Sequence, residues 1–252
     1  MRSIHNICYS PDQGQYLDLY LPECDLFPVM VYFHGGGLEV GDKAGQPALV
    51  EYLTGCGIAV VSANYRMYPQ AKYPDFLTDA AQAVAWVFRN IHNYGTATGI
   101  YVGGSSAGGY ISQMLCFDPS WLAEQGLHPD RICGFIHDAG QPTCHFNVLR
   151  ERGLDTRRVI IDESAPLYHI QADKPYPPML IIVSDQDMPN RYEQTALLVS
   201  TLTHFGYGDR VTLRIMQGKH CAYVNKLDDQ GHSILGQLVS KFIWSKEETL
   251  WT

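Results

Sequence analysis

A serine lies at the centre of a glycine-rich segment, Gly104-Ser105-Ser106-Ala107-Gly108, which fits the pattern G-x-S-x-G. The segment follows an apolar run at residues 100–102 and precedes a helical stretch from Ala107 to about Cys116. In this strand–turn–helix context, a tight turn flanked by small residues exposes the serine hydroxyl. The N-terminus of a helix also favours negative charge that develops beside it. The arrangement favours nucleophilic attack by Ser106 on an acyl carbonyl.

A second glycine-rich segment, His34-Gly35-Gly36-Gly37, follows the apolar run at residues 29–33. Acyl transfer builds negative charge on the carbonyl oxygen, and each backbone N–H group aimed at that oxygen contributes about 3 kcal/mol. Consecutive glycines let the backbone turn its N–H groups towards a substrate without clashes from Cβ atoms. Together with the N–H group of Ala107, two or three donors would converge on the oxygen.

Elements that position these two segments are predicted by the pattern of apolar residues. Continuous apolar runs are typical of parallel strands that are covered on both faces. Residues 6–21 predict one or two antiparallel strands that join the same sheet, and residues 211–215 alternate as expected of a strand near an edge. The continuous runs lie at residues 29–33, 58–61, 100–102, 132–136 and 179–183.

Apolar residues at helical spacing lie between the strands and predict helices at residues 77–91, 192–202 and 235–242. This alternation predicts an α/β protein with a mostly parallel twisted sheet and helices on both faces. Residues 138–178 have no long periodic segment and are too long for a plain connection. We expect a lid-like excursion there, over the ligand-binding edge of the sheet, with a short helix near residues 147–152. The whole chain, residues 1–252, is predicted to form a single domain.

Composition excludes several classes of protein. The 252 residues are 46% hydrophobic and 17% charged, which is typical of a folded globular chain and not of a disordered one. A net charge of −8 repels phosphate backbones, so nucleic acid is not an expected partner. No apolar run approaches membrane-spanning length and no signal segment is visible, so we expect a cytoplasmic protein without a membrane segment. The seven cysteines form no CxxC pair, and no cluster has metal-ligand spacing, so we expect reduced thiols and no metal.

Taken together, five segments resemble the α/β-hydrolase esterases that carry an HGGG motif. These esterases include the hormone-sensitive-lipase-like group and the smaller acetyl-esterase-like and feruloyl-esterase-like relatives. The resemblance covers residues 15–245 and implies an α/β-hydrolase fold of about eight strands, a Ser–Asp–His triad in that chain order, and no cofactor. It also selects Gly36, Gly37 and Ala107 as the oxyanion hole. The segments are His34–Gly37, Asn64–Arg66, Tyr73-Pro74, Asp79 and Gly104–Gly108.

The resemblance also indicates the other two members of the triad. The acid should follow the apolar run at residues 179–183, where Asp187 matches the family position and Asp185 is the alternative. The base should follow the last strand, where His220 matches and His232 is the alternative. Arg66 and Asp79 resemble positions that brace the floor of the active site.

The activity that this resemblance implies is that of a serine carboxylic-ester hydrolase working through an acyl-enzyme. Only 33 residues precede the HGGG segment, fewer than the N-terminal cap of the larger relatives requires, so we expect an open site. Such a site would suit a small-molecule ester with a short acyl group, such as acetyl, on a sugar or phenolic alcohol. Two alternatives are an amidase of the arylformamidase type and a non-catalytic binding protein with a hydrolase fold.

Overall fold

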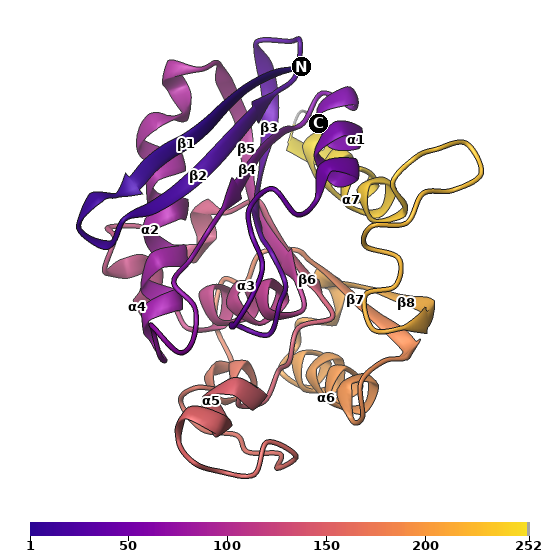
Figure 1. Cartoon of the computed structure of the whole chain (residues 1–252). Helices are drawn as coiled ribbons and strands as arrows, with labels where there is room; N and C mark the ends of the chain where they lie inside the picture. Colours follow the sequence, from indigo (N-terminus) through magenta and orange to yellow (C-terminus); the bar gives the residue numbers. More distant parts are fainter. Residues whose placement is uncertain (251–252) are drawn as a thin grey trace.

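The computed structural model describes residues 1–250, so the last two residues of the predicted domain lie outside the described part. Its centre is an eight-stranded sheet with the strand order β1-β2-β4-β3-β5-β6-β7-β8 (Figure 1). The six strands from β4 to β8 in that order pair in parallel, whereas β2 runs antiparallel to both of its neighbours. The mostly parallel sheet of about eight strands is therefore as predicted.

The strands agree with the predicted apolar runs and extend most of them by a few residues. One or two antiparallel strands were expected near the N-terminus, and two are present; β8 forms the edge of the sheet opposite to them. The strands are β1 (Arg2–Ser10), β2 (Gln15–Leu21), β3 (Leu26–Phe33), β4 (Ala59–Ala63), β5 (Thr96–Ser105), β6 (Gly134–Asp138), β7 (Met179–Gln186) and β8 (Val211–Lys219).

The helices include all those predicted and two that the apolar pattern did not indicate. The two missed helices, α1 and α4, are only nine and four residues long, so a helical stripe has little length in which to show. The helices are α1 (Pro47–Gly55), α2 (Asp75–Asn90), α3 (Ala107–Phe117), α4 (Ser120–Ala123), α5 (Phe146–Glu151), α6 (Arg191–His204) and α7 (Ile234–Leu250).

Both faces of the sheet are covered by helices, and strand β3 shows how. Val29, Val31 and Phe33 belong to an apolar cluster with residues of α2, α3 and α6. Met30 and Tyr32 belong to a second cluster with residues of α1 and α7, and those two helices lie side by side (Figure 1). Because successive side chains of a strand point to opposite faces, a strand covered on both sides must be apolar throughout. The continuous apolar runs were therefore interpreted correctly.

The segment between β6 and β7 is largely irregular and contains the short helix α5, close to where a short helix was predicted. In Figure 1 this helix lies at the end of the molecule opposite to the N-terminus. The segment is tied to the rest of the molecule by Tyr110 Oη, which donates to Ser164 O over 2.7 Å, and by Tyr73 N, which donates to Glu151 Oε1 over 3.0 Å.

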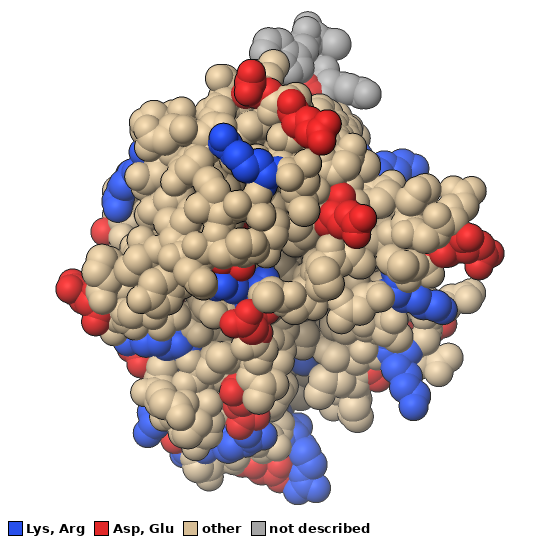
Figure 2. Space-filling model, turned by 45° about the horizontal axis from the view of Figure 1, so that its top comes forward, with Lys and Arg blue, Asp and Glu red and all other residues tan. Residues whose placement is uncertain are grey.

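The surface carries charges of both signs. Figure 2 shows acidic and basic side chains scattered among wide uncharged areas on the face that it presents. Within residues 1–250, none of the helices combines the length and the apolar character that crossing a membrane requires.

Candidate active site

Ser106 occupies the turn between β5 and α3 and has a positive φ of 57° with a ψ of −111°. A residue with a side chain rarely adopts such a conformation, which is characteristic of strained functional turns. The turn packs so tightly against β3 that a Cβ atom at Gly104 or at Gly108 would collide with the carbonyl oxygen of Phe33. The two flanking glycines of the G-x-S-x-G segment are therefore required by the packing of this turn.

His220 follows β8 directly and lies between Ser106 and Asp187. Its Nε2 atom is 2.8 Å from Ser106 Oγ, and its Nδ1 atom is 2.6 Å from Asp187 Oδ1. The three side chains come from the carboxyl ends of β5, β7 and β8, which meet at one edge because these strands are parallel. The structure thus joins the three residues in one chain of hydrogen bonds.

The Asp187 carboxylate is held by more than the histidine. The backbone N–H of Met188 donates to Asp187 Oδ1 over 2.7 Å, and that of Ser184 donates to Oδ2 over 3.3 Å. Burial raises the pKa of Asp187, but the hydrogen bond and charge of His220 and these backbone donors outweigh it and lower the pKa below its usual range. The carboxylate is therefore ionised at neutral pH and can stabilise a positive charge on the ring of His220.

The two alternative residues lie elsewhere. Asp185 is exposed and accepts a hydrogen bond from the backbone N–H of Gly218 over 2.8 Å, which ties the ends of β7 and β8 together. His232 is exposed in the loop before α7, where its Nδ1 atom is 3.9 Å from Asp228 Oδ2. Neither side chain is brought to Ser106.

The HGGG segment lies against the serine turn. A Cβ atom at Gly35 would be 3.3 Å from the Cβ atom of Ser106. Gly36 and Gly37 have φ angles of 117° and 66°, and among the described residues no acceptor is present for either backbone N–H. Ala107 is the first residue of α3, so its N–H group has no acceptor within the helix. The three predicted oxyanion donors are thus free to bind a ligand.

Two neighbours hold the HGGG segment in place. Asn147 Nδ2 donates to Gly37 O over 2.9 Å, and Tyr65 Oη donates to His34 O over 2.9 Å. The ring of Tyr65 also stacks on the ring of His34 with centroids 4.5 Å apart. The excursion after β6 therefore contacts the segment directly, through α5.

Arg66, which is half-buried, and Asp79 form an ion pair. The Arg66 Nε and Nη2 atoms each lie 2.8 Å from an oxygen of Asp79, and the Arg66 backbone N–H donates to the same carboxylate over 2.8 Å. Asp79 is fully buried in α2. The pair fixes the loop after β4, which carries Tyr65, and this is consistent with the bracing role expected for it.

Two further residues lie near the site, and neither belongs to the predicted triad or oxyanion hole. Asp138, at the end of β6, is fully buried, and burial raises its pKa to about 6. Its only sequence signal is an acidic residue directly after an apolar run. Cys221 has its Sγ atom 3.6 Å from His220 Nε2 and is joined to the histidine in the chain. Within residues 1–250, His, Cys, Asp and Glu form no cluster that could hold a metal ion.

A cavity of about 270 Å³ lies between the excursion and the segment that follows Asp187. Phe146 and Met188 form part of its wall, and the ring of Phe146 lies 3.0 Å from where a Cβ atom of Gly37 would be. The rest of the lining is mostly polar: Gln141, Thr156, Arg157, Arg158, Pro189, Asn190, Arg191 and Gln194. Phe146 therefore contacts both this cavity and Gly37 of the HGGG segment.

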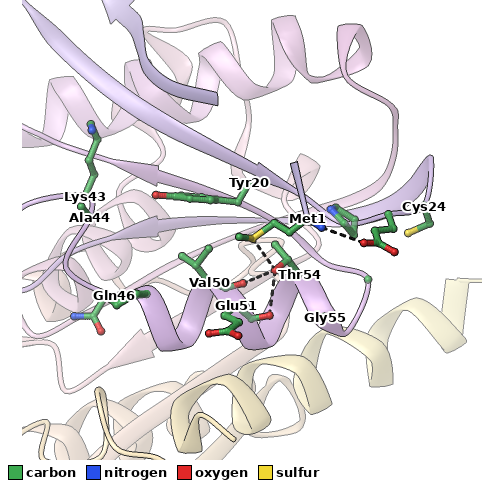
Figure 3. A pocket seen from close by; sticks show the side chains of 14 residues that line it. Met1, Tyr20, Cys24, Lys43, Ala44, Gln46, Val50, Glu51, Thr54 and Gly55 are labelled. Atoms are coloured by element: carbon green, nitrogen blue, oxygen red, sulfur yellow. Dashed lines mark hydrogen bonds and ion pairs between the residues drawn. The ribbon is translucent and has the colours of Figure 1, made fainter. Parts of the chain in front are cut away.

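A larger cavity, of about 850 Å³, lies beside the N-terminus, between β2 and α1 (Figure 3). Tyr20, Val50 and Thr54 line it, and Thr54 Oγ1 donates to Met1 Sδ over 3.2 Å. Its lining includes no residue of the Ser106 site.

Known proteins resemble this chain in both sequence and fold. Residues 17–122 match the family model BD-FAE, a segment that contains the HGGG and G-x-S-x-G motifs. A probable isoprenylcysteine alpha-carbonyl methylesterase of Arabidopsis thaliana is 35% identical over 124 residues. That match covers 48% of this chain and 29% of the relative, so the chain matches less than a third of the relative's length.

Two solved structures extend the resemblance over nearly the whole chain. The thermophilic esterase Est2 of Thermogutta terrifontis, in its butyrate-bound form, has a TM-score of 0.77 at 23% identity and covers 96% of this chain and 94% of its own. A truncated form of a carbohydrate esterase from gut microbiota has a TM-score of 0.77 at 18% identity, and the match covers 98% of this chain and 97% of the esterase. These similarities confirm the predicted α/β-hydrolase fold and, with the sequence matches, the predicted resemblance to carboxylesterases.

Proposed function

We propose that this chain, which has an α/β-hydrolase fold and resembles carboxylesterases, is a serine carboxylic-ester hydrolase. The observation that carries the proposal is the chain of hydrogen bonds from Asp187 through His220 to Ser106. A hydroxyl next to an imidazole that is itself oriented by a carboxylate is the arrangement that activates serine for acyl transfer.

In the proposed reaction, Ser106 Oγ attacks the ester carbonyl while His220 Nε2 accepts the hydroxyl proton. The tetrahedral intermediate collapses, and His220 returns the proton to the leaving alcohol. Water then attacks the acyl-enzyme, with His220 again accepting a proton, and Ser106 is released with the carboxylic acid. Asp187 holds the ring through Nδ1 and stabilises its positive charge, but does not itself take the proton.

The proposed oxyanion hole consists of the N–H groups of Gly36, Gly37 and Ala107. Support comes from their lack of acceptors among the described residues and from the contact of Gly35 with the Ser106 turn. Donors held rigidly in this way stabilise the charge that develops on the carbonyl oxygen, and each is worth about 3 kcal/mol.

The proposed substrate is a small-molecule ester with a short acyl group on a sugar or phenolic alcohol. A long acyl chain gains about 0.8 kcal/mol per buried CH₂ group only where apolar walls enclose it, and the cavity beside Phe146 is small and has more polar than apolar residues in its lining. Est2, a relative in fold, is described with butyrate and with propionate bound. Another protein of the same fold is a carbohydrate esterase. A sugar alcohol would suit the polar residues that line the cavity.

Labelling with a fluorophosphonate probe, combined with a panel of substrates, tests this proposal. We expect the wild type to be labelled at Ser106 and to hydrolyse p-nitrophenyl acetate faster than the hexanoyl ester. Ser106→Ala should fold, as judged by circular dichroism, and lose label and turnover, with a fall in kcat of about 10⁶. Absence of both labelling and ester hydrolysis in the wild type would overturn the proposal. A higher kcat/KM for N-formylkynurenine than for every ester would instead favour the arylformamidase type.

A further inference from the structure

A buried network of hydroxyl groups surrounds one carboxylate beside Ser106. One oxygen of Asp138 accepts a hydrogen bond from Ser105 Oγ, and the other accepts one from Tyr223 Oη. Ser105 Oγ in turn accepts from Tyr32 Oη over 2.8 Å. The carboxyl group is fully buried, as is Tyr32, and Tyr223 is nearly so. The proposed reaction uses none of these four side chains.

Asp138 contacts the serine turn through its main chain as well. The backbone N–H of Ser106 donates to Asp138 O over 2.7 Å. Ser105, which the carboxylate binds, is the residue just before Ser106. The nucleophile's turn is therefore held to the end of β6 at two consecutive residues.

The other partner of Asp138 belongs to the loop that carries the histidine. Tyr223 lies three residues after His220. In the turn that follows the histidine, the backbone N–H of Val224 donates to Cys221 O over 3.1 Å. Cys221 has a positive φ of 54°, which a side chain disfavours and which surrounding contacts must maintain. On the other side of the histidine, Ser184 Oγ donates to Lys219 O over 3.0 Å. The bond from Tyr223 to Asp138 is thus one of the side-chain contacts that connect this loop to the sheet.

We propose that Asp138 is a positioning residue whose carboxylate sets the separation of Ser106 and His220 by binding Ser105 and Tyr223 at the same time. The inference rests on the proposed function, because the separation matters for turnover only if the serine and the histidine react together. A carboxylate suits this task because its two oxygens accept hydrogen bonds from both sides.

The surroundings of Asp138 indicate how its charge behaves. The residue that faces it from β3 is Tyr32. The loop after β7 contributes Asp187, and the loop after β8 contributes His220, Cys221 and Tyr223. Burial raises the pKa of Asp138 to about 6, although the hydrogen bonds from Ser105 and Tyr223 and the charge of His220 act in the opposite direction. The carboxyl group therefore changes its charge within the pH range in which an esterase is assayed.

The variant Tyr223→Phe removes the hydrogen bond from Tyr223 to Asp138 without changing a charge. The matched control is Tyr101→Phe, since Tyr101 Oη also donates to a buried carboxylate, Glu247 Oε1 over 2.8 Å, but this carboxylate belongs to α7. We expect kcat for p-nitrophenyl acetate to fall about tenfold or more in Tyr223→Phe, with KM nearly unchanged, because small displacements of reacting groups are costly. Tyr101→Phe should lower thermal stability and leave kcat as in the wild type.

A second measurement follows the ionisation of Asp138 through the pH dependence of kcat/KM. In the wild type, the plot of log kcat/KM against pH should contain an ionisation near pH 6 from Asp138. The same plot for Asp138→Asn should lack this ionisation. Replacement of a residue with only a structural role would not change the shape of the plot. Two results together would overturn the inference: equal kcat values in Tyr223→Phe and Tyr101→Phe, and the same dependence of kcat/KM on pH in the wild type and Asp138→Asn. The proposed function would still stand if the wild type hydrolyses esters. An inactive and unlabelled wild type would overturn the proposed function and this inference with it. If Asp138→Asn does not fold, the comparison of the two tyrosine variants decides.

Discussion

At the scale of single residues, the two neighbouring aspartates after β7 have different surroundings. The Asp187 carboxylate is bound to His220 over 2.6 Å, whereas that of Asp185 is exposed and bound to a backbone N–H group. If Asp187 orients the histidine, only its charge and position should matter for the reaction. The exposed carboxylate of Asp185 should matter mainly for the pairing of β7 with β8.

Asp187→Asn is therefore expected to lower kcat by roughly 10³–10⁴, because the amide favours the wrong tautomer of His220. Asp185→Asn is the matched control and should keep kcat within a few-fold of wild type, because Asp185 does not touch His220. The two kcat values on p-nitrophenyl acetate give the comparison. The opposite ranking would show that Asp185 is the acid of the triad.

Cys221 offers a second test at this scale. Its side chain is half-buried, and burial together with the charges of Asp138 and Asp187 holds the pKa of the thiol far above its usual range. Since the thiolate is the reactive form, Cys221 should react slowly with maleimide at pH 7.5. Exposed Cys8 and Cys24 serve as internal standards in a peptide-mapped time course.

Cys221→Ser should also keep most of the activity, because Ser106 already supplies the nucleophile in the proposed reaction. Labelling of Cys221 as fast as that of Cys8 would contradict the expectation that a raised pKa keeps its thiol unreactive. A loss of kcat in Cys221→Ser as large as in Ser106→Ala would contradict its exclusion from the chemistry.

At the scale of elements, α5 links the excursion after β6 to the proposed oxyanion hole. Asn147 binds Gly37 O over 2.9 Å, and the Phe146 ring packs against the same glycine. The excursion predicted for residues 138–178 thus contributes a contact to the HGGG segment. Gly37 has a positive φ, so its carbonyl contact helps to keep its N–H group in the proposed orientation.

Asn147→Ala should therefore lower kcat about tenfold, less than the 10²–10³ that loss of a whole oxyanion donor costs. KM should change little, because the contact acts on the transition state. Asn90→Ala is a matched control, since Asn90 Nδ2 also donates to a main-chain oxygen, Trp86 O, over 2.8 Å, but within α2. Equal kcat values in the two variants would show that the Asn147 contact does not support the oxyanion hole.

At the scale of the whole molecule, Asp138 couples stability to pH. Its pKa is about 6 in the folded protein against an ordinary value of 3.8. A carboxyl group with a raised pKa stabilises the folded state fully only below pH 3.8, and this contribution is lost as the pH rises through about 6. Ionising the group in the folded protein is costly because its charge is buried.

The free energy of unfolding of wild type minus that of Asp138→Asn should therefore fall between pH 4 and pH 7, by up to about 3 kcal/mol. Urea denaturation of both proteins at several pH values measures this difference, and the other titrating groups cancel between them. A difference that stays constant over this range would mean that the pKa of Asp138 is not raised by folding.

The sequence by itself determined those features that depend on neighbouring residues. The alternation of apolar runs and helical stripes predicted a mostly parallel sheet because burial on both faces leaves its mark on each strand separately. The G-x-S-x-G and HGGG segments were recognisable because tight turns need glycine at defined positions, as the packing of Gly104 and Gly108 against Phe33 shows. The short helix α1 left too few residues for such a pattern.

Only the tertiary structure decided which distant groups meet. Asp187 was preferred over Asp185 only because of the resemblance to a family, and the different surroundings of the two arise where the ends of β7 and β8 lie side by side. Asp138 and Tyr223 are 85 residues apart, and nothing near either of them in the sequence indicates their contact. Such pairs are set by the order of strands in the sheet, which depends on long-range packing and not on local sequence.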